Sequence, residues 1–186
     1  CGPQTRVIHA PADGIQPTVG LRLEAGTARR VLPVALSELR NRVVELRTAL
    51  GSEAAILYNL MMRASIDPHP GPTLSPLLAD QAEPWVTTAH RLARTGAAAR
   101  ALDWSERTLR RRMLENFGYG YATLVRVGRS LQARSLLQRG LSLADVSATT
   151  GYADQSHMTR EFTSLVGATP AQFSKAAKRS KLLPSG

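Results

Sequence analysis

One short unit occurs twice in the second half of the chain. "AAARALDWSERTLRRRMLENFG" (residues 97–118) and "SLADVSATTGYADQSHMTREFTSLVG" (residues 142–167) each read as a short helix, a turn of a few residues and a longer helix ending at a glycine. This is the layout of a helix-turn-helix unit. Two such units, joined by a helical pattern over residues 120–139, predict a mainly α fold for this part of the chain.

The helical patterns begin at Glu83 and follow one another with short turns, and no strand pattern is obvious among them. Ser142 is followed three residues later by Asp145, which resembles a capping box, and Asp154 can cap the helix after it. Gly151 stands where the shorter helix of the second unit must stop. About seven helices are predicted, near residues 84–94, 97–102, 105–116, 120–139, 142–149, 155–165 and 170–178.

The first half of the chain has a different pattern. Val19, Leu21 and Leu23 alternate with polar residues and glycine, which predicts a strand. Ser37 is expected to cap a helix that ends at Gly51, and a second helix is expected over residues 52–64. Four prolines lie within residues 65–76, which indicates a linker. We therefore divide the chain into a strand and loop remnant (1–35), a helical connector (36–64), a linker (65–83), a helical domain (84–179) and a tail (180–186).

The net charge of +10 is confined to the second part of the chain. Residues 1–84 hold eight Lys and Arg against eight Asp and Glu, whereas residues 85–186 hold sixteen against six. Only four of these cations lie near the end, at Lys175, Lys178, Arg179 and Lys181. Such an asymmetry favours a polyanionic partner, most often nucleic acid. An inert basic surface is the alternative.

Cys1 is the only cysteine, so neither an intrachain disulfide nor a cysteine-based zinc site can form. No apolar run approaches the roughly 18 residues of a membrane span, and no secretory signal is evident. We expect a reducing, cytoplasmic location, no membrane contact, no cofactor and no metal. The start at Cys1 rather than Met indicates a fragment; a mature lipoprotein with a lipidated Cys1 is the alternative.

In the longer helix of the second unit, Met158, Phe162 and Leu165 recur at helical spacing and are expected to face the core. The opposite face holds short polar groups and one arginine, instead of the Glu and Lys mixture of a solvated helix. Gln can bond adenine edges, Arg can bond guanine edges, and Ser or Thr suits phosphate. We predict base contacts from Gln155, Ser156 and Arg160, and a base or phosphate contact from Thr159. His157 is expected to be a phosphate neighbour or a surface residue, and not a metal ligand.

The first unit repeats this arrangement with more charge. Leu109 and Met113 are expected to face inward, and Trp104 is expected to pack in the core. Four arginines lie within residues 107–112, which is difficult to explain as packing. We predict DNA contacts from Arg107, Arg110 and Arg111, with a solvated basic face as the alternative.

Residues 83–178 resemble the DNA-binding domain of the AraC/XylS family of bacterial transcription regulators. The resemblance rests on fixed spacings across about half of the chain. The matching residues are Gly151 and Tyr152 in the turn, Ser156, Arg160 and Phe162 in the second unit, Gly167 and Pro170 after it, Arg129, Ala133, Leu136, Leu137 and Gly140 in the linker helix, and "WSERTLRRR" in the first unit. It implies that one chain inserts two recognition helices into successive major grooves.

The match is less complete in the first unit. Asp103 stands where the family usually has glycine, Ala98 replaces a larger core residue, and Gly128 lies inside the linker helix, where glycine costs about 0.5–1 kcal/mol relative to alanine. Residues 17–51 are loosely similar to the end of a sensor domain found in some members. This implies that the part of that domain before the given sequence is absent, along with whatever effector it senses.

We therefore expect a sequence-specific, double-stranded DNA-binding transcription regulator that is not an enzyme. RNA polymerase and a second copy of the chain are further candidate partners. Two alternatives stay open: a helical adaptor that binds an acidic protein, and the DNA-binding part of a fused enzyme whose catalytic portion lies elsewhere.

Overall fold

The computed structural model describes residues 3–6, 28–32, 34–66, 84–94 and 102–182, and the following account concerns these residues. Helices dominate this part of the chain, and no strand occurs within it, so the expectation of a mainly α protein is confirmed. The expected strand near Val19, the expected helix at 97–102 and nearly all of the proline-rich linker lie outside the described residues.

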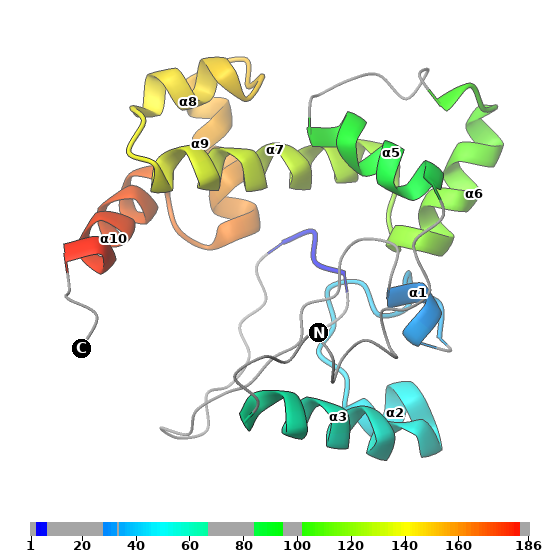
Figure 1. Ribbon diagram of the computed structural model, residues 1–186. Helices are drawn as coiled ribbons and strands as arrows, with labels where there is room; N and C mark the ends of the chain where they lie inside the picture. The colour runs from blue at the N-terminus through cyan, green and yellow to red at the C-terminus, as the bar shows by residue number, and fades with distance from the viewer. Residues whose placement is uncertain (1–2, 7–27, 33, 67–83, 95–101, 183–186) are drawn as a thin grey trace.

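Among the described residues, six helices belong to the part of the protein that holds both repeated units. They are α5 (Pro84–Arg94), α6 (Glu106–Phe117), α7 (Tyr121–Gln138), α8 (Leu143–Thr149), α9 (Gln155–Val166) and α10 (Pro170–Leu182). Figure 1 shows α7 running across the middle, with α5 and α6 toward one end and α8, α9 and α10 toward the other. The helix expected at 120–139 is therefore a shared strut. Apart from the one at 97–102, the helices predicted after residue 83 lie within a few residues of the observed ones.

The first half of α7 takes part in one hydrophobic core. Its buried members come from α5, from α6, from the residues beside α6 and from α7 itself. Trp85 and Trp104 pack against this cluster with ring centroids 5.0 Å apart, so the prediction that Trp104 packs with the core is confirmed. The buried members are Val86, Ala89, Ala93, Leu102, Met113, Phe117, Tyr119 and Leu124.

The second half of α7 takes part in a separate core with α8, α9 and α10. Met158 and Phe162 of α9 are fully buried here, as their spacing predicted. The ring of Phe173 from α10 meets that of Phe162 at 5.6 Å. Each repeated unit thus has its own core, and α7 is the element common to both. The other buried members are Ala133, Leu136, Leu137, Val146 and Tyr152.

The N-terminal part is less regular than expected. It contains α1 (Ala28–Val31), α2 (Leu46–Leu50), the 3-10 helix η1 (Gly51–Glu53) and α3 (Ala54–Ile66). The prediction of a helix starting after Ser37 is wrong, because turns and extended residues occupy the chain up to Glu45. Asn41 adopts a left-handed conformation with φ of 56°, and its side-chain amide exchanges two hydrogen bonds of 2.8 Å with Thr5. That distant partner replaces the local bonds a helix would require.

Candidate nucleic-acid interface

The turn of the second unit follows the expected chemistry. At the start of α8, the Ser142 side chain accepts a hydrogen bond from the backbone amide of Asp145. At the start of α9, the Asp154 side chain accepts a hydrogen bond of 2.6 Å from the backbone amide of His157. Between the helices, Gly151 has a positive φ of 73° and Tyr152 turns into the core. Two helices joined by this fixed turn give α9 a defined direction relative to α8.

The exposed face of α9 brings together the four residues predicted for this unit. Gln155, Ser156 and Arg160 are exposed, and Thr159 is half-buried, with its hydroxyl donating to the carbonyl of Gln155 at 2.8 Å. Thr163, one turn further along α9, is half-buried, and its Oγ1 is shielded from solvent. The face is therefore free for a partner over the first half of α9.

The first unit offers a strongly basic helix. Ser105 caps α6 by accepting the amide of Thr108, and Asp103 adopts a positive φ of 50°, the conformation for which the family uses glycine. The predicted residues Arg107, Arg110 and Arg111 are all exposed. Arg111 lies 3.3 Å from Glu115 one turn later, a surface pair of small energetic value.

The fourth arginine of this cluster has a different role from the other three. Arg112 is half-buried, and its guanidinium carbon lies 4.7 Å from the ring centroid of Trp104 and 5.7 Å from that of Trp85. Cations over indole rings are attracted by the negative ring face. The expectation that the arginine cluster is not explained by packing is thus wrong for Arg112.

Sequence patterns missed an ion-pair cluster between α7 and α9. Glu161 lies 2.9 Å from Nε of Arg126, 3.5 Å from a guanidinium nitrogen of Arg129 and 3.6 Å from Nε2 of His157. The Nδ1 of His157 accepts a hydrogen bond from the backbone amide of Ala153 at 3.3 Å, and the His157 side chain, at the start of α9, is 32% exposed. The two positive charges at 126 and 129 and the negative charge at 161 are visible in the sequence, but no local pattern links them.

Tyr152 closes the same cluster from the turn. Its ring lies 5.0 Å from the guanidinium of Arg129 and 5.4 Å from the imidazole of His157. Burial, together with the nearby Glu161 carboxylate, raises the pKa of Tyr152 to about 12. The phenol therefore stays neutral at all physiological pH values, and its role here is packing.

The distance between the two units is set by α7. Its 18 residues span about 27 Å at 1.5 Å per residue. Successive turns of the DNA major groove on one side of the duplex lie about 34 Å apart. A helix of this length, with one exposed polar helix face near each end, is compatible with that spacing.

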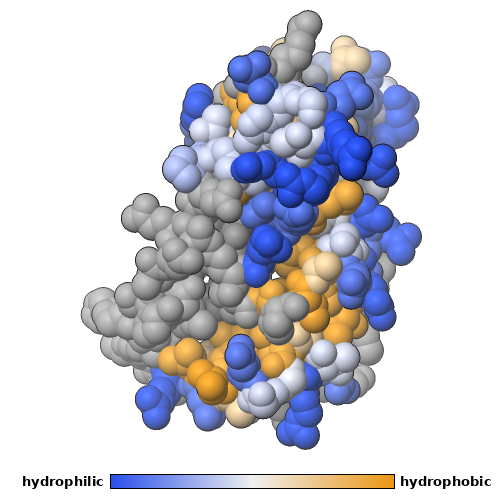
Figure 2. All heavy atoms as spheres, turned by 90° about the vertical axis from the view of Figure 1, so that its right-hand side faces the viewer, coloured by the Kyte–Doolittle hydropathy of each residue, from blue (hydrophilic) through white to orange (hydrophobic). Residues whose placement is uncertain are grey.

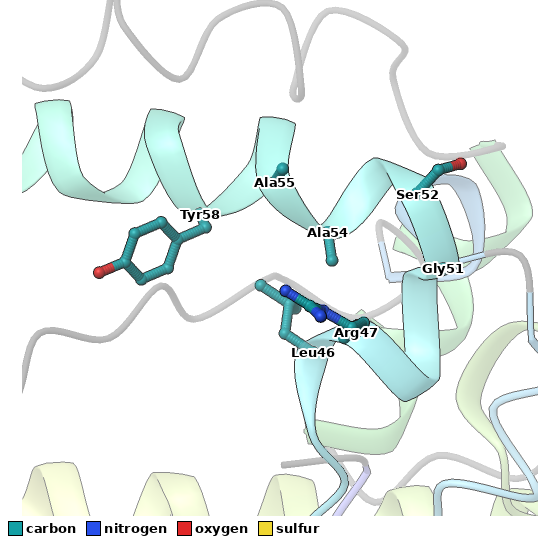
Figure 3. Close-up of a pocket in the computed structure, with 7 residues that line it drawn as sticks. All are labelled: Leu46, Arg47, Gly51, Ser52, Ala54, Ala55 and Tyr58. Atoms are coloured by element: carbon teal, nitrogen blue, oxygen red, sulfur yellow. The ribbon is translucent and has the colours of Figure 1, made fainter.

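A separate apolar surface lies on the N-terminal helices. A groove of about 620 Å³ is lined by α2, η1 and the start of α3, where Leu46 and Arg47 face Ala54 (Figure 3). On α3, Ile56, Tyr58 and Met62 are about half exposed or more, and Tyr58 also lines the groove. Figure 2 shows hydrophobic residues gathered low on the visible face and hydrophilic ones above them.

Two kinds of site are not found in the part of the chain that the structure describes. No three His, Cys, Asp or Glu side chains there are grouped so as to hold a metal ion. None of the described helices has the length and apolar character to cross a membrane.

A family model of helix-turn-helix domains matches residues 98–176, somewhat less than half of the chain. The match spans both repeated units and the helix between them. Residues 98–176 are a helix-turn-helix domain of the AraC type. This AraC-type domain binds double-stranded DNA and is a regulatory, not a catalytic, module. No curated protein and no solved structure matches the chain.

Proposed function

We propose that this AraC-type regulator recognises a specific DNA sequence by inserting α6 and α9 into successive major grooves. The observation that carries the proposal is the exposed polar face near each end of α7, each supported by its own hydrophobic core. Because the strut and the cores are independent of the exposed faces, substitutions on those faces can alter recognition without unfolding the domain.

The proposed contacts differ between the two helices. On α9, Gln155, Ser156 and Arg160 contact base edges, and Thr159 contacts a base or a phosphate. On α6, the contacts come from Arg107, Arg110 and Arg111. These α6 side chains can neutralise phosphates as well as bond guanine, so they contribute to affinity for any duplex.

The remaining assignments extend this proposal to the rest of the chain. Residues 84–179 form the DNA-binding domain, 36–64 form a connector whose apolar α3 face receives a second copy, and 65–83 form the linker. We assign residues 1–35 to an effector-sensing domain and residues 180–186 to a tail. The regulator acts in the cytoplasm and contacts RNA polymerase while bound to its site.

The experiment that tests this function is selection from random duplex DNA at near-physiological salt, with non-specific DNA as competitor. We expect one motif with two half-sites about one helical turn apart. A single half-site would mean that only one helix reads bases. No enrichment would refute sequence-specific binding.

Salt dependence separates this function from a protein-binding adaptor. Contacts to several phosphates release counterions, so the affinity for DNA should fall steeply as salt rises. Binding to an acidic protein that resists salt, without any shift of duplex DNA, would instead favour the adaptor.

A further inference from the structure

The ion-pair cluster around Glu161 is the one set of charged side chains, within the described residues, that ties α7 to α9. Glu161 is itself on α9, and its partners Arg126 and Arg129 are on α7. The Arg126 bond is both short, at 2.9 Å, and oriented as a hydrogen bond from Nε to the carboxylate. The cluster therefore constrains the two helices in a directional way that apolar packing does not.

The charged groups of this cluster are partly buried, so they depend on one another for stabilisation. The side chain of Glu161 is 15% exposed, and that of Arg129 is 20% exposed. Arg126, at 40% exposed, keeps more contact with water. The Glu161 carboxylate is therefore stabilised mainly by its two arginine partners, and its loss would leave the guanidinium of Arg129 poorly solvated. The helices would then have to shift to find new partners or water.

The position of Glu161 on α9 excludes a direct role in reading DNA. At 100° per residue, Glu161 lies about 160° around the helix from Thr159. It thus points toward α7 while Gln155, Ser156, Thr159 and Arg160 occupy the exposed side. An effect of Glu161 on base preference must therefore be transmitted through the orientation of α9.

We infer that Glu161 is a positioning residue that fixes the orientation of α9 on α7 and thereby the base preference of the second unit. This inference rests on the proposed function, since it requires α9 to read bases. Arg126 and Arg129 anchor the carboxylate on the strut, and the contact of Arg129 with Tyr152 extends the constraint to the turn.

The test compares Glu161→Gln with Arg126→Gln in the whole chain. The two substitutions change the net charge in opposite directions but break the same bond. Affinities are measured for the selected site, for a site scrambled only in the α9 half and for one scrambled only in the α6 half. We expect both variants to lose about tenfold in discrimination at the α9 half-site and none at the α6 half-site.

The charge swap Arg126→Glu with Glu161→Arg provides the rescue. It restores a pair between the same two helices, and we expect it to recover part of the lost discrimination. Thermal unfolding of each variant, followed by circular dichroism, checks that the helices are folded at the temperature of the binding assay.

Three results would overturn the inference. One is unchanged discrimination in both single variants. Another is a plain charge effect, in which Glu161→Gln binds every duplex more tightly and Arg126→Gln binds every duplex more weakly at constant discrimination. The third is failure of the unaltered chain to select any motif, which would refute the proposed function together with the inference; the first two leave that function standing.

Discussion

The backbone of Gly118 lies directly against the backbone of Leu36. A β-carbon placed on Gly118 would be 2.7 Å from the carbonyl oxygen of Leu36 and 2.8 Å from its carbonyl carbon. Gly118 also ends α6 in a left-handed conformation with φ of 72°, and Leu36 is only 2% exposed. The N-terminal segment is thus packed against the end of α6 through a contact that requires glycine.

Replacing Gly118 by alanine should therefore destabilise the protein beyond the usual cost of a positive φ. Gly151→Ala is the matched control, since Gly151 has φ of 73° but open space around its Cα. We expect Gly151→Ala to cost about 1 kcal/mol and Gly118→Ala to cost at least about 2 kcal/mol more. Urea unfolding of both variants measures the difference. Equal losses would show that Leu36 is not held against Gly118 in solution.

Helix ends in this protein are predictable wherever neighbouring residues decide them. Ser142 and Asp154 were expected as caps, and each accepts the amide three residues on. The same reasoning failed over residues 37–45, because Asn41 bonds Thr5, which lies 36 positions away. Local preference was overridden there by a contact that only the folded chain brings about.

In the candidate site, too, local features were predictable from the sequence and contacts between distant residues were not. Periodicity identified the inner face of α9, including Met158 and Phe162, and hence the outer face as well. It could not identify the bond between Arg126 and Glu161, which are 35 positions apart. Nor could it separate Arg112 from its neighbours, because the two tryptophan rings meet Arg112 only in the folded domain.

Arg112 should act on stability and not on recognition. We expect Arg112→Met to lower the free energy of unfolding by about 1 kcal/mol through loss of its contacts with Trp85 and Trp104. Arg110→Met is the comparison, since the exposed Arg110 makes no ion pair or ring contact within the described part of the chain. It should weaken DNA binding at unchanged stability. Unfolding and DNA titration of both variants test these two roles. Weaker DNA binding at unchanged stability in Arg112→Met, with lower stability in Arg110→Met, would contradict them.

The hydroxyl of Tyr152 destabilises the folded state. The Tyr152 oxygen is buried and has no hydrogen-bond partner among the described residues. Because an unpaired buried hydroxyl forfeits its hydration, Tyr152→Phe should raise the free energy of unfolding by about 1 kcal/mol at neutral pH. Denaturant unfolding measures the change. A loss of stability would mean that the hydroxyl is bonded in solution, for example to a trapped water molecule.

Alkaline pH should destabilise the protein in a defined window. Burial raises the pKa of Tyr119 to about 12, and that of Tyr152 is also about 12. In the unfolded chain a tyrosine loses its proton near pH 10. Between these values the folded state binds more protons, so the free energy of unfolding should fall as pH rises from about 10 to 12, by on the order of 2 kcal/mol per tyrosine.

Unfolding measurements across this pH range, with Tyr152→Phe as the comparison, test the assignment. Between pH 10 and 12 the free energy of unfolding should fall less in the variant than in the unaltered chain, because Tyr119 is then the one tyrosine of the two whose raised pKa contributes. An equal loss in both proteins would mean that Tyr152 is not the titrating group.

Arg160 should carry sequence preference at one position of the site. It lies in the middle of the exposed face of α9, where a guanidinium can bond a guanine edge with two hydrogen bonds. We expect Arg160→Ala to weaken binding of the selected site by about 1–3 kcal/mol and to relax preference at a single base pair. The control is Arg63→Ala, which removes the same charge from the exposed side of α3, outside the DNA-binding domain. Anisotropy titrations against the selected site and its single-base variants separate the two. Equal, uniform losses in both variants would reduce the role of Arg160 to charge alone.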